Sequence, residues 1–305
     1  MCTAIAINFD GLYFGRTMDI EFNFDGRIVT APRRFMLSEK NAEGLAVHYA
    51  VTGMARVVNG YPLFADAFNE AGLCMAALSF PQTAKYFDTC SDFSVNLSPF
   101  ELIPHVLGKC ANLKEAREEL SEVRIVDVSF SKDVPNTPLH WIVSDNSGSI
   151  AVEPTDKGLI IYDNKTGILT NEPPFPFHEK NTRLYSHLTA DSLKEDGLGF
   201  GMGAVGLPGD WSSPSRFIRA DFLRRTVEAR RSATESEYVD CFFSVLEALS
   251  VPRGAVRSND GKPHFTQYSC CMDVQNGIYY CKPYGKISVL VYPVSRRLME
   301  GIDLN

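Results

Sequence analysis

The chain has 305 residues, of which 45% are hydrophobic and 22% charged, and its formal net charge is −7. This is the composition of an ordinary globular protein that is long enough to bury a sizeable core, and it is unlike that of a disordered chain. An acidic balance without a basic run argues against nucleic acid and anionic membrane surfaces as main partners. No stretch reaches about 18 apolar residues, and no signal-peptide pattern precedes the first strand, so a cytoplasmic location is expected.

The N-terminal part of the chain predicts strands. Residues 3–9 and 12–18 flank Asp10-Gly11, which is a strong signal for a two-residue hairpin turn. Further apolar runs predict strands at residues 28–30, 45–51 and 71–80. Cys2 would then begin a strand at the edge of a sheet.

The middle of the chain predicts two helices and a return to strands. Apolar residues recur at helical spacing over residues 99–110, and residues 113–120 have the charge alternation of an exposed helix with Asn112 as its cap. The later strands are expected at residues 125–130, 139–144 and 150–153.

Two long amphipathic helices are expected next, at residues 213–230 and 234–249, with Ser212 or Ser213 ahead of Pro214 as the first cap. The chain then returns to strands at residues 264–274, 278–281 and 287–292. Strand blocks separated by helix pairs predict an α+β fold of four layers, αββα, in which two antiparallel-rich sheets lie between helix layers. Without a linker or repeat, residues 1–305 are expected to form a single domain.

The cysteines and histidines show no metal-site spacing. The eight cysteines include no Cys-x-x-Cys pair, and the six histidines include no His-x-His or His-Glu-x-x-His pattern. We therefore expect no metal and no organic cofactor. A catalytic cysteine in most hydrolases needs a histidine base, but an N-terminal cysteine does not.

Cys2 stands directly behind Met1, so removal of that methionine would make Cys2 the N-terminal residue. A cysteine thiol with a pKa of about 8.5 and an α-amino group with a pKa of about 7.7–8.0 both titrate near neutral pH. The free amine can then take the proton of the thiol, and one residue supplies both nucleophile and base of an amide hydrolase. The alternative is that Cys2 is a small apolar residue at the start of a strand.

Such a nucleophile needs a nearby cation and a group that holds the amine. The predicted hairpin brings Arg16 and Asp19 back toward residue 2. Arg16 would favour the thiolate, and Asp19 would hold the ammonium. Taken alone, an Arg-x-x-Asp pair is more often a surface ion pair.

Four segments together resemble the choloylglycine hydrolase family, which includes bile salt hydrolases and penicillin V acylases. They occur in the order of the family from residue 2 to beyond residue 216, so the resemblance covers nearly the whole chain. The longest of them, Gly-Asp-aromatic-Ser-Ser-Pro-Ser-Arg-Phe, is specific. The segments are Met1-Cys2-Thr3, Gly15-Arg16-Thr17-Met18-Asp19, Leu169-Thr170-Asn171 followed by Pro173, and Leu207-Pro208-Gly209-Asp210-Trp211-Ser212-Ser213-Pro214-Ser215-Arg216-Phe217.

The resemblance implies an N-terminal-nucleophile hydrolase sandwich and a role for each matching residue. Cys2 would be the nucleophile with its own amine as base, Arg16 would lie beside the thiolate, and Asp19 would hold the amine. Asn171 would donate its side-chain amide to the oxyanion, and Arg216 would support the site electrostatically. Without the resemblance, Asn171 is a turn residue before Pro173 and Arg216 a solvated residue of a first helical turn.

Ser79 departs from the pattern of the family. Many bile salt hydrolases have Asn in the segment that reads Ala77-Leu78-Ser79-Phe80-Pro81 here, and penicillin V acylases often have Tyr. If that position contributes mainly a backbone N–H to the oxyanion, serine can supply it. If the side chain matters, rate or substrate choice will differ.

The expected reaction is hydrolysis of the amide bond of a small molecule, a glycine- or taurine-conjugated bile salt, to free bile acid and amino acid. Met18, Phe22, Phe24 and Tyr61 are the candidates for lining an apolar substrate pocket, although an apolar stripe is more often plain core. Alternatives are a penicillin V acylase, an N-acyl-homoserine-lactone acylase, or a catalytically silent binding protein of the same fold. The resemblance also implies a homotetramer.

Overall fold

A computed structural model describes residues 1–41, 43–92, 94–192, 201, 203–228 and 233–301. It contains two seven-stranded antiparallel sheets. The sheet that carries the N-terminus has the strand order β12-β1-β2-β14-β15-β16, and β13 pairs with β14 outside this path. Its strands are β1 (Cys2–Asn8), β2 (Leu12–Ile20), β12 (Ile168–Leu169), β13 (Val256–Arg257), β14 (Pro263–Asp273), β15 (Ile278–Pro283) and β16 (Leu290–Pro293).

The second sheet has the order β11-β10-β9-β6-β5-β4-β3. Its strands are β3 (Arg27–Ala31), β4 (Val51–Val58), β5 (Tyr61–Asn69), β6 (Cys74–Ser79), β9 (Leu139–Asp145), β10 (Gly148–Thr155) and β11 (Gly158–Asp163). A small parallel pair, β7 (Val95–Leu97) and β8 (Val123–Ile125), lies beside it.

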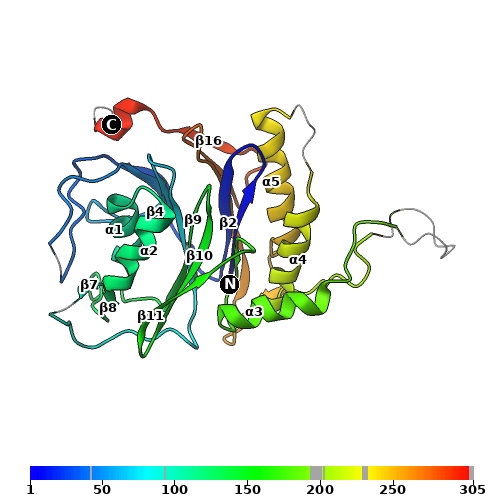
Figure 1. The fold of residues 1–305 in the computed structure, drawn as a ribbon, viewed down its shortest axis with the longest axis horizontal. Helices are drawn as coiled ribbons and strands as arrows, with labels where there is room; N and C mark the ends of the chain where they lie inside the picture. Colours follow the sequence, from blue (N-terminus) through cyan, green and yellow to red (C-terminus); the bar gives the residue numbers. More distant parts are fainter. Residues whose placement is uncertain (42, 93, 193–200, 202, 229–232, 302–305) are drawn as a thin grey trace.

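Helices cover the outer face of each sheet, so the expected four-layer αββα architecture is confirmed (Figure 1). On the second sheet lie α1 (Leu102–Lys109) and α2 (Leu113–Glu122), and on the first lie α4 (Ser213–Thr226) and α5 (Glu235–Leu249). Packed against α4 is α3 (Phe175–Thr182), and α6 (Arg296–Glu300) follows β16. Short 3₁₀ turns, η1 (Pro99–Glu101) and η2 (Arg183–Tyr185), precede α1 and follow α3.

The period of two along the strands divides the core into two parts. In β6, Cys74, Ala76 and Leu78 pack into the core between the sheets, whereas Met75 and Ala77 belong to the core beneath α1 and α2. Both faces of this strand are buried, which explains its continuous apolar sequence.

Gly15 allows β2 to lie close to its neighbours. A Cβ atom at this position would stand 1.9 Å from the carbonyl oxygen of Cys270 in β14 and 2.8 Å from the ring of Phe242 in α5. Only glycine fits there, and it immediately precedes Arg16 on the strand that pairs with Cys2.

Several boundaries differ from the sequence expectations. The apolar run at residues 45–51 is mostly a loop, because its backbone bonds to Gly108 and Arg33 rather than to a strand, and β4 begins only at Val51. The strand expected at residues 125–130 ends at Ile125. The helix expected at residues 213–230 ends at Thr226, and residues 229 and 230 lie outside the described residues.

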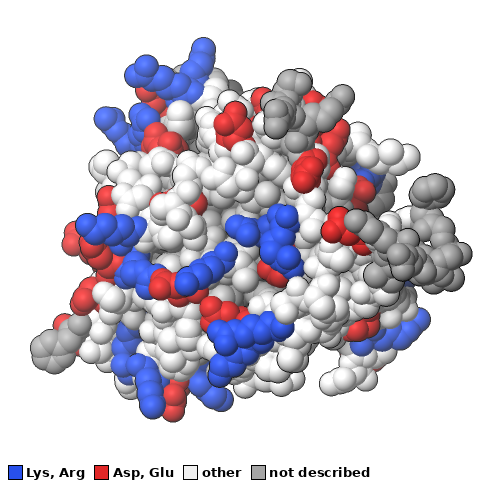
Figure 2. Space-filling model, turned by 45° about the vertical axis from the view of Figure 1, so that its right-hand side comes forward, with Lys and Arg blue, Asp and Glu red and all other residues white. Residues whose placement is uncertain are grey.

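Basic and acidic side chains are interspersed on the face seen in Figure 2. No extended region of one sign stands out there, which agrees with the small net charge. Within the described ranges, no helix is long and apolar enough to cross a bilayer.

Candidate active site

The hairpin β1–β2 sets the geometry around Cys2. Cys2 pairs with Met18 and Ala4 with Arg16, so Cys2, Arg16 and Met18 lie on the face of the sheet that looks toward the second sheet. The Cys2 side chain is 2% exposed, and its Sγ lies 3.9 Å from Sδ of Met18. The predicted proximity of Cys2 and Arg16 is present in the structure.

Arg16 is fully buried between the two sheets. One terminal guanidinium nitrogen donates to the carbonyl oxygens of Ala77 at 2.6 Å and Ala65 at 3.2 Å, and the other lies 3.5 Å from Sδ of Met18. Burial lowers the pKa of Arg16, but attraction to Cys2, Tyr268 and Asp66 outweighs it, so the pKa is raised. The cation beside Cys2 is therefore secure at any working pH.

Asp66 of β5 supplies part of the charge that balances Arg16, and nothing in the local sequence marked it. Its carboxylate is fully buried and accepts hydrogen bonds from Tyr268 Oη at 2.5 Å and Tyr279 Oη at 2.6 Å. Burial raises the pKa of Asp66, and Arg16 and both tyrosines oppose this rise. Because the partners come from β5 and from distant β14 and β15, only the fold brings them together.

Asp19 lies on the opposite face of β2. Its carboxylate accepts from Thr17 Oγ1 at 2.8 Å and from Thr266 Oγ1 at 2.6 Å. The Met1 ammonium donates to the Asp19 backbone carbonyl at 2.6 Å, and the Asp19 amide donates to the Met1 carbonyl at 3.0 Å. While Met1 is attached, Asp19 therefore holds the N-terminal amine through its backbone, and its carboxylate is bound by the two threonines.

Asn171, just after β12, joins three parts of the site. Its Oδ1 accepts from the Cys2 backbone nitrogen at 2.9 Å and from Arg216 at 2.7 Å. Its Nδ2 donates to the carbonyl oxygen of Ser79 at 2.8 Å. An amide NH₂ has two N–H groups, so the second remains available for another acceptor.

Arg216 approaches the same strand from α4. The helix begins behind Ser212, whose hydroxyl accepts from the Ser215 amide, and this cap places Arg216 in the first turns. One terminal nitrogen donates to the Cys2 carbonyl at 2.5 Å and to Thr3 Oγ1 at 2.6 Å. Burial lowers the pKa of Arg216, because no nearby anion outweighs the loss of water.

His178 supports Asn171 from behind and was not expected from the sequence. Its Nε2 lies 2.9 Å from the Asn171 carbonyl oxygen, and its ring stacks on Phe217. Among the described residues Nδ1 has no hydrogen-bond partner, as fits a neutral ring protonated at Nε2. Burial lowers the pKa of His178 to about 4.

A cavity of about 320 Å³ opens onto Cys2 and Arg16. Ser79, Met18, Phe22 and Phe24, all named from the sequence, are among its walls. The sequence reasoning missed a larger apolar set that faces the same space, from β2, β5, β9, η1 and the loop before β9: Ile20, Leu63, Phe64, Phe100, Val134, Pro135 and Leu139. The cavity is thus a mainly apolar chamber with Cys2 and Arg16 among its walls.

Tyr61 is placed elsewhere, which corrects the expectation that it lines this pocket. Its hydroxyl donates to the Ser38 carbonyl at 3.1 Å, and its ring lies near Phe35 and Phe130. Tyr61 begins β5, and its side chain packs against these neighbouring loops, outside the walls of the Cys2 cavity.

All eight cysteines are free thiols. Burial raises the pKa values of five of them, Cys74, Cys110, Cys270, Cys271 and Cys281, whereas Cys90 is exposed and Cys241 partly exposed. Across the described part of the chain, no group of three or more His, Cys, Asp or Glu side chains is arranged to hold a metal ion.

Comparison with known proteins agrees with this geometry. Residues 2–304 match the family model of the linear amide C–N hydrolases, choloylglycine hydrolase family. Two relatives named bile salt hydrolase/transferase are similar over 100% of this chain and 95% of their own: that of Lactiplantibacillus plantarum at 39% identity and that of Clostridium perfringens at 36%.

Solved structures extend the likeness to three dimensions. The C2A variant of the conjugated bile acid hydrolase from C. perfringens superposes with a TM-score of 0.90 at 35% identity, covering 99% of this chain and 94% of that one. Penicillin V acylase from Agrobacterium tumefaciens shares the fold, with a TM-score of 0.78 at 22% identity over 97% of this chain and 87% of its own. The chain belongs to the choloylglycine hydrolase family of linear amide C–N hydrolases.

Proposed function

We propose that this enzyme hydrolyses the amide bond of glycine- or taurine-conjugated bile salts, with Cys2 as nucleophile. The observation that carries the proposal is that Cys2 and Arg16 both line one mainly apolar cavity. The mainly apolar walls suit a rigid steroid acyl group. The names of the bacterial relatives support the same substrate class.

The first chemical step needs a free amine at Cys2. We propose that Met1 is removed, which turns the Cys2 backbone nitrogen into an amine that lies 2.9 Å from Asn171 Oδ1. This amine takes the proton of the thiol, and the Arg16 cation stabilises the thiolate. The thiolate then attacks the amide carbonyl, and a C–S bond forms.

The tetrahedral intermediate carries its negative charge on the former carbonyl oxygen. The unused N–H of Asn171 Nδ2 and the backbone N–H of Ser79 are the proposed donors to this oxyanion. The Nδ2 bond to the Ser79 carbonyl supports the assignment, because it holds Asn171 against Ser79, which is a wall residue of the cavity. Arg216 fixes the orientation of Asn171 by donating to its Oδ1.

Collapse of the intermediate breaks the C–N bond. The Cys2 ammonium gives its proton to the leaving nitrogen, and glycine or taurine departs. Water, deprotonated by the same amine, then attacks the thioester and releases the free bile acid. No step of this sequence requires a cofactor.

The test is intact mass of the purified protein combined with measurement of glycine released from glycocholate and taurine from taurocholate. We expect a chain without Met1 and a release that falls to background in Cys2→Ala. The matched control is Cys90→Ala, which removes an exposed thiol and should leave the rate unchanged.

Three outcomes would contradict the proposal. Turnover with Met1 still attached would overturn the amine as base. Turnover of penicillin V or an acyl-homoserine lactone without any turnover of bile salts would overturn the substrate. Binding of glycocholate without product would indicate a silent binding protein.

A further inference from the structure

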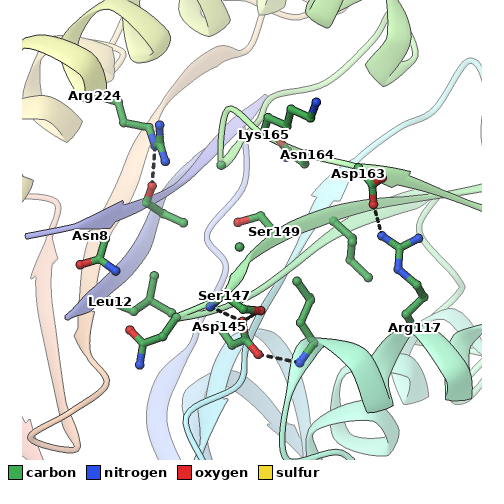
Figure 3. A pocket seen from close by; sticks show the side chains of 16 residues that line it. Asn8, Leu12, Arg117, Asp145, Ser147, Ser149, Asp163, Asn164, Lys165 and Arg224 are labelled. Atoms are coloured by element: carbon green, nitrogen blue, oxygen red, sulfur yellow. Dashed lines mark hydrogen bonds and ion pairs between the residues drawn. The ribbon is translucent and has the colours of Figure 1, made fainter.

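A second and larger cavity, of about 560 Å³, lies at the other end of β1 (Figure 3). It shares no wall residue with the Cys2 cavity. Its walls come from the end of β1, the β9–β10 turn, the start of α2, the loop before β12 and the last turn of α4. Ala6, one of these residues, lies four positions along β1 from Cys2, which is about 13 Å.

Most charged groups of this second cavity are already engaged. Arg117 forms an ion pair with Asp163. The Asp145 carboxylate accepts from the Leu113 amide at 2.7 Å and from the amide and hydroxyl of Ser147. The charge of Asp163 is therefore paired with Arg117, whereas the Asp145 carboxylate is bound by neutral donors and keeps its charge at the cavity wall.

Arg224 is one of two exceptions among the described wall residues. Its Nε donates to the Ala6 carbonyl at 2.8 Å, and within the described ranges this is its one hydrogen bond, with no carboxylate at ion-pair distance. Burial lowers the pKa of Arg224, and attraction to Asp221 offsets this effect only in part. Figure 3 shows its guanidinium on the upper side of the cavity, opposite Leu12 and Asp145.

The space beside Arg224 depends on a glycine. Gly167 has a φ of +62°, and a Cβ there would stand 3.2 Å from Arg224 Nε and 3.0 Å from the Ala6 carbonyl oxygen. A side chain at this position would be strained and would crowd the guanidinium. Lys165, two residues earlier, is an exposed wall residue and likewise has no carboxylate partner among the described residues.

The other walls present hydrogen-bonding side chains. Asn8, Asn146 and Ser147 are exposed there, and Ser149 is half-buried. An arginine with free terminal N–H groups binds phosphate or carboxylate in a fork. Amide and hydroxyl groups around it suit a ligand that carries hydroxyls.

We propose that this cavity is a binding site for a small hydroxylated oxyanion, held by the terminal N–H groups of Arg224 with Lys165 at the rim. A sugar phosphate is the class that fits best, and a sugar acid has the same chemistry with a carboxylate in place of the phosphate. The site goes beyond the amide hydrolysis at Cys2 and does not depend on it.

Helix α4 connects this site to β1, the strand that carries the nucleophile. Arg224 binds the carbonyl of Ala6, and Arg216, eight residues earlier on the same helix, binds the carbonyl of Cys2. Two arginines of α4 thus hold both ends of one strand. A ligand that engages Arg224 acts on the strand whose first residue is Cys2.

The experiment is isothermal titration of the full chain with glucose 6-phosphate, inorganic phosphate and gluconate, at fixed ionic strength set with sodium chloride. We expect Arg224→Met to weaken binding at least about tenfold, the loss of a charge-assisted fork. The matched control is Arg225→Met. Arg225 follows Arg224 in the chain, but it is exposed and pairs with Asp221 outside the cavity. Its affinity should stay within about twofold of the unaltered protein.

A second variant tests the site independently if Arg224→Met does not fold. Lys165 is exposed, so Lys165→Glu should fold normally, and it should weaken binding several-fold by placing a negative charge at the rim. Preference for glucose 6-phosphate or for gluconate would identify the phosphate or the carboxylate as the natural group. Absence of binding by all three probes, or equal losses in Arg224→Met and Arg225→Met, would overturn the site.

Discussion

Arg16 and Arg216 reach the Cys2 strand from opposite faces of one sheet, and their surroundings differ. Arg16 looks toward the second sheet, where attraction to Cys2, Tyr268 and Asp66 raises its pKa despite complete burial. Arg216 comes from α4 and binds neutral acceptors on Cys2, Thr3 and Asn171, so burial lowers its pKa. Arg16 is thus balanced by a nearby carboxylate, whereas Arg216 is held by carbonyl, amide and hydroxyl oxygens.

The two arginines therefore have different roles. A buried cation whose charge is balanced costs less stability than one left without a partner. A cation held by carbonyl and amide oxygens instead fixes the backbone that carries the nucleophile. We therefore expect Arg16 to matter first for reactivity and Arg216 for the geometry of Cys2 and Asn171.

The largest effect is expected for Arg16→Met, which should lower kcat/KM about 10³-fold because the thiolate loses its adjacent cation. The variant also leaves Asp66 buried without Arg16. Combining it with Asp66→Asn should recover part of the stability but none of the activity. Recovery of activity in the double variant, measured as amino acid release, would contradict the electrostatic role of Arg16.

Asp66→Asn alone should lower the free energy of unfolding by about 3–5 kcal/mol, because Arg16 then remains buried without part of its counter-charge. Urea unfolding measures this loss. The control is Asp260→Asn, an exposed carboxylate whose ion pair with Lys262 lies at the surface, and its change should be near zero. Equal effects of the two variants would show that Asp66 does not balance Arg16.

The pH dependence of stability tests whether His178, which interacts with Arg216, is held neutral in the folded protein. Burial, with smaller contributions from His140 and Arg216, holds the folded pKa of His178 at about 4, below the value of about 6.5 in an unfolded chain. As the pH falls from 6.5 to 4, the unfolded state binds a proton that the folded state refuses. Stability should therefore drop by up to about 3 kcal/mol over this window and level off below it.

The measurement is urea unfolding at a series of pH values, with His178→Gln as the comparison. Glutamine keeps a donor for the Asn171 carbonyl but does not titrate, so the difference between the two curves isolates His178. Parallel curves from pH 6.5 to 4 would show that the ring is not held neutral.

The smallest effect is expected at Ser79. Its carbonyl, not its hydroxyl, accepts the hydrogen bond from Asn171, so Ser79→Ala should change kcat/KM by less than about threefold. Asn171→Ala, in contrast, should lower it about 10²–10³-fold by removing an oxyanion donor. A loss in Ser79→Ala as large as that in Asn171→Ala would give the serine hydroxyl a catalytic part.

The local signals in the sequence predicted the parts of the fold that depend on neighbours along the chain. Asp10-Gly11 correctly predicted the hairpin that pairs Cys2 with Met18, although three residues rather than two join its strands, and the capped amphipathic patterns predicted α2, α4 and α5. The run at residues 45–51 misled because its apolar side chains belong to a loop packed near α1. β5 was missed because Pro62 and Asp66 interrupt its apolar pattern, and β12 has only two residues.

The site shows the same division. Arg16 and Asp19 could be predicted from the hairpin, whereas Asn171 and Arg216 were found only through the family resemblance, because they come from distant segments. Asp66, Thr266 and His178 carry no local signal, since their partners are brought together by both sheets and α3. Ser79 lines the Cys2 cavity, and its contact with Asn171 is made by the backbone.

The distribution of free thiols determines how this enzyme responds to covalent probes. Five cysteines are buried and have raised pKa values, so alkylating reagents have three realistic targets, of which Cys90 is the most accessible. A bulky maleimide will label Cys90 first. Counting labels on the chain therefore does not measure loss of activity. A small electrophile joined to an apolar steroid tail will instead be guided into the cavity above Cys2. Selective labelling of Cys2 therefore depends on the shape of the apolar tail more than on the reactivity of the electrophile.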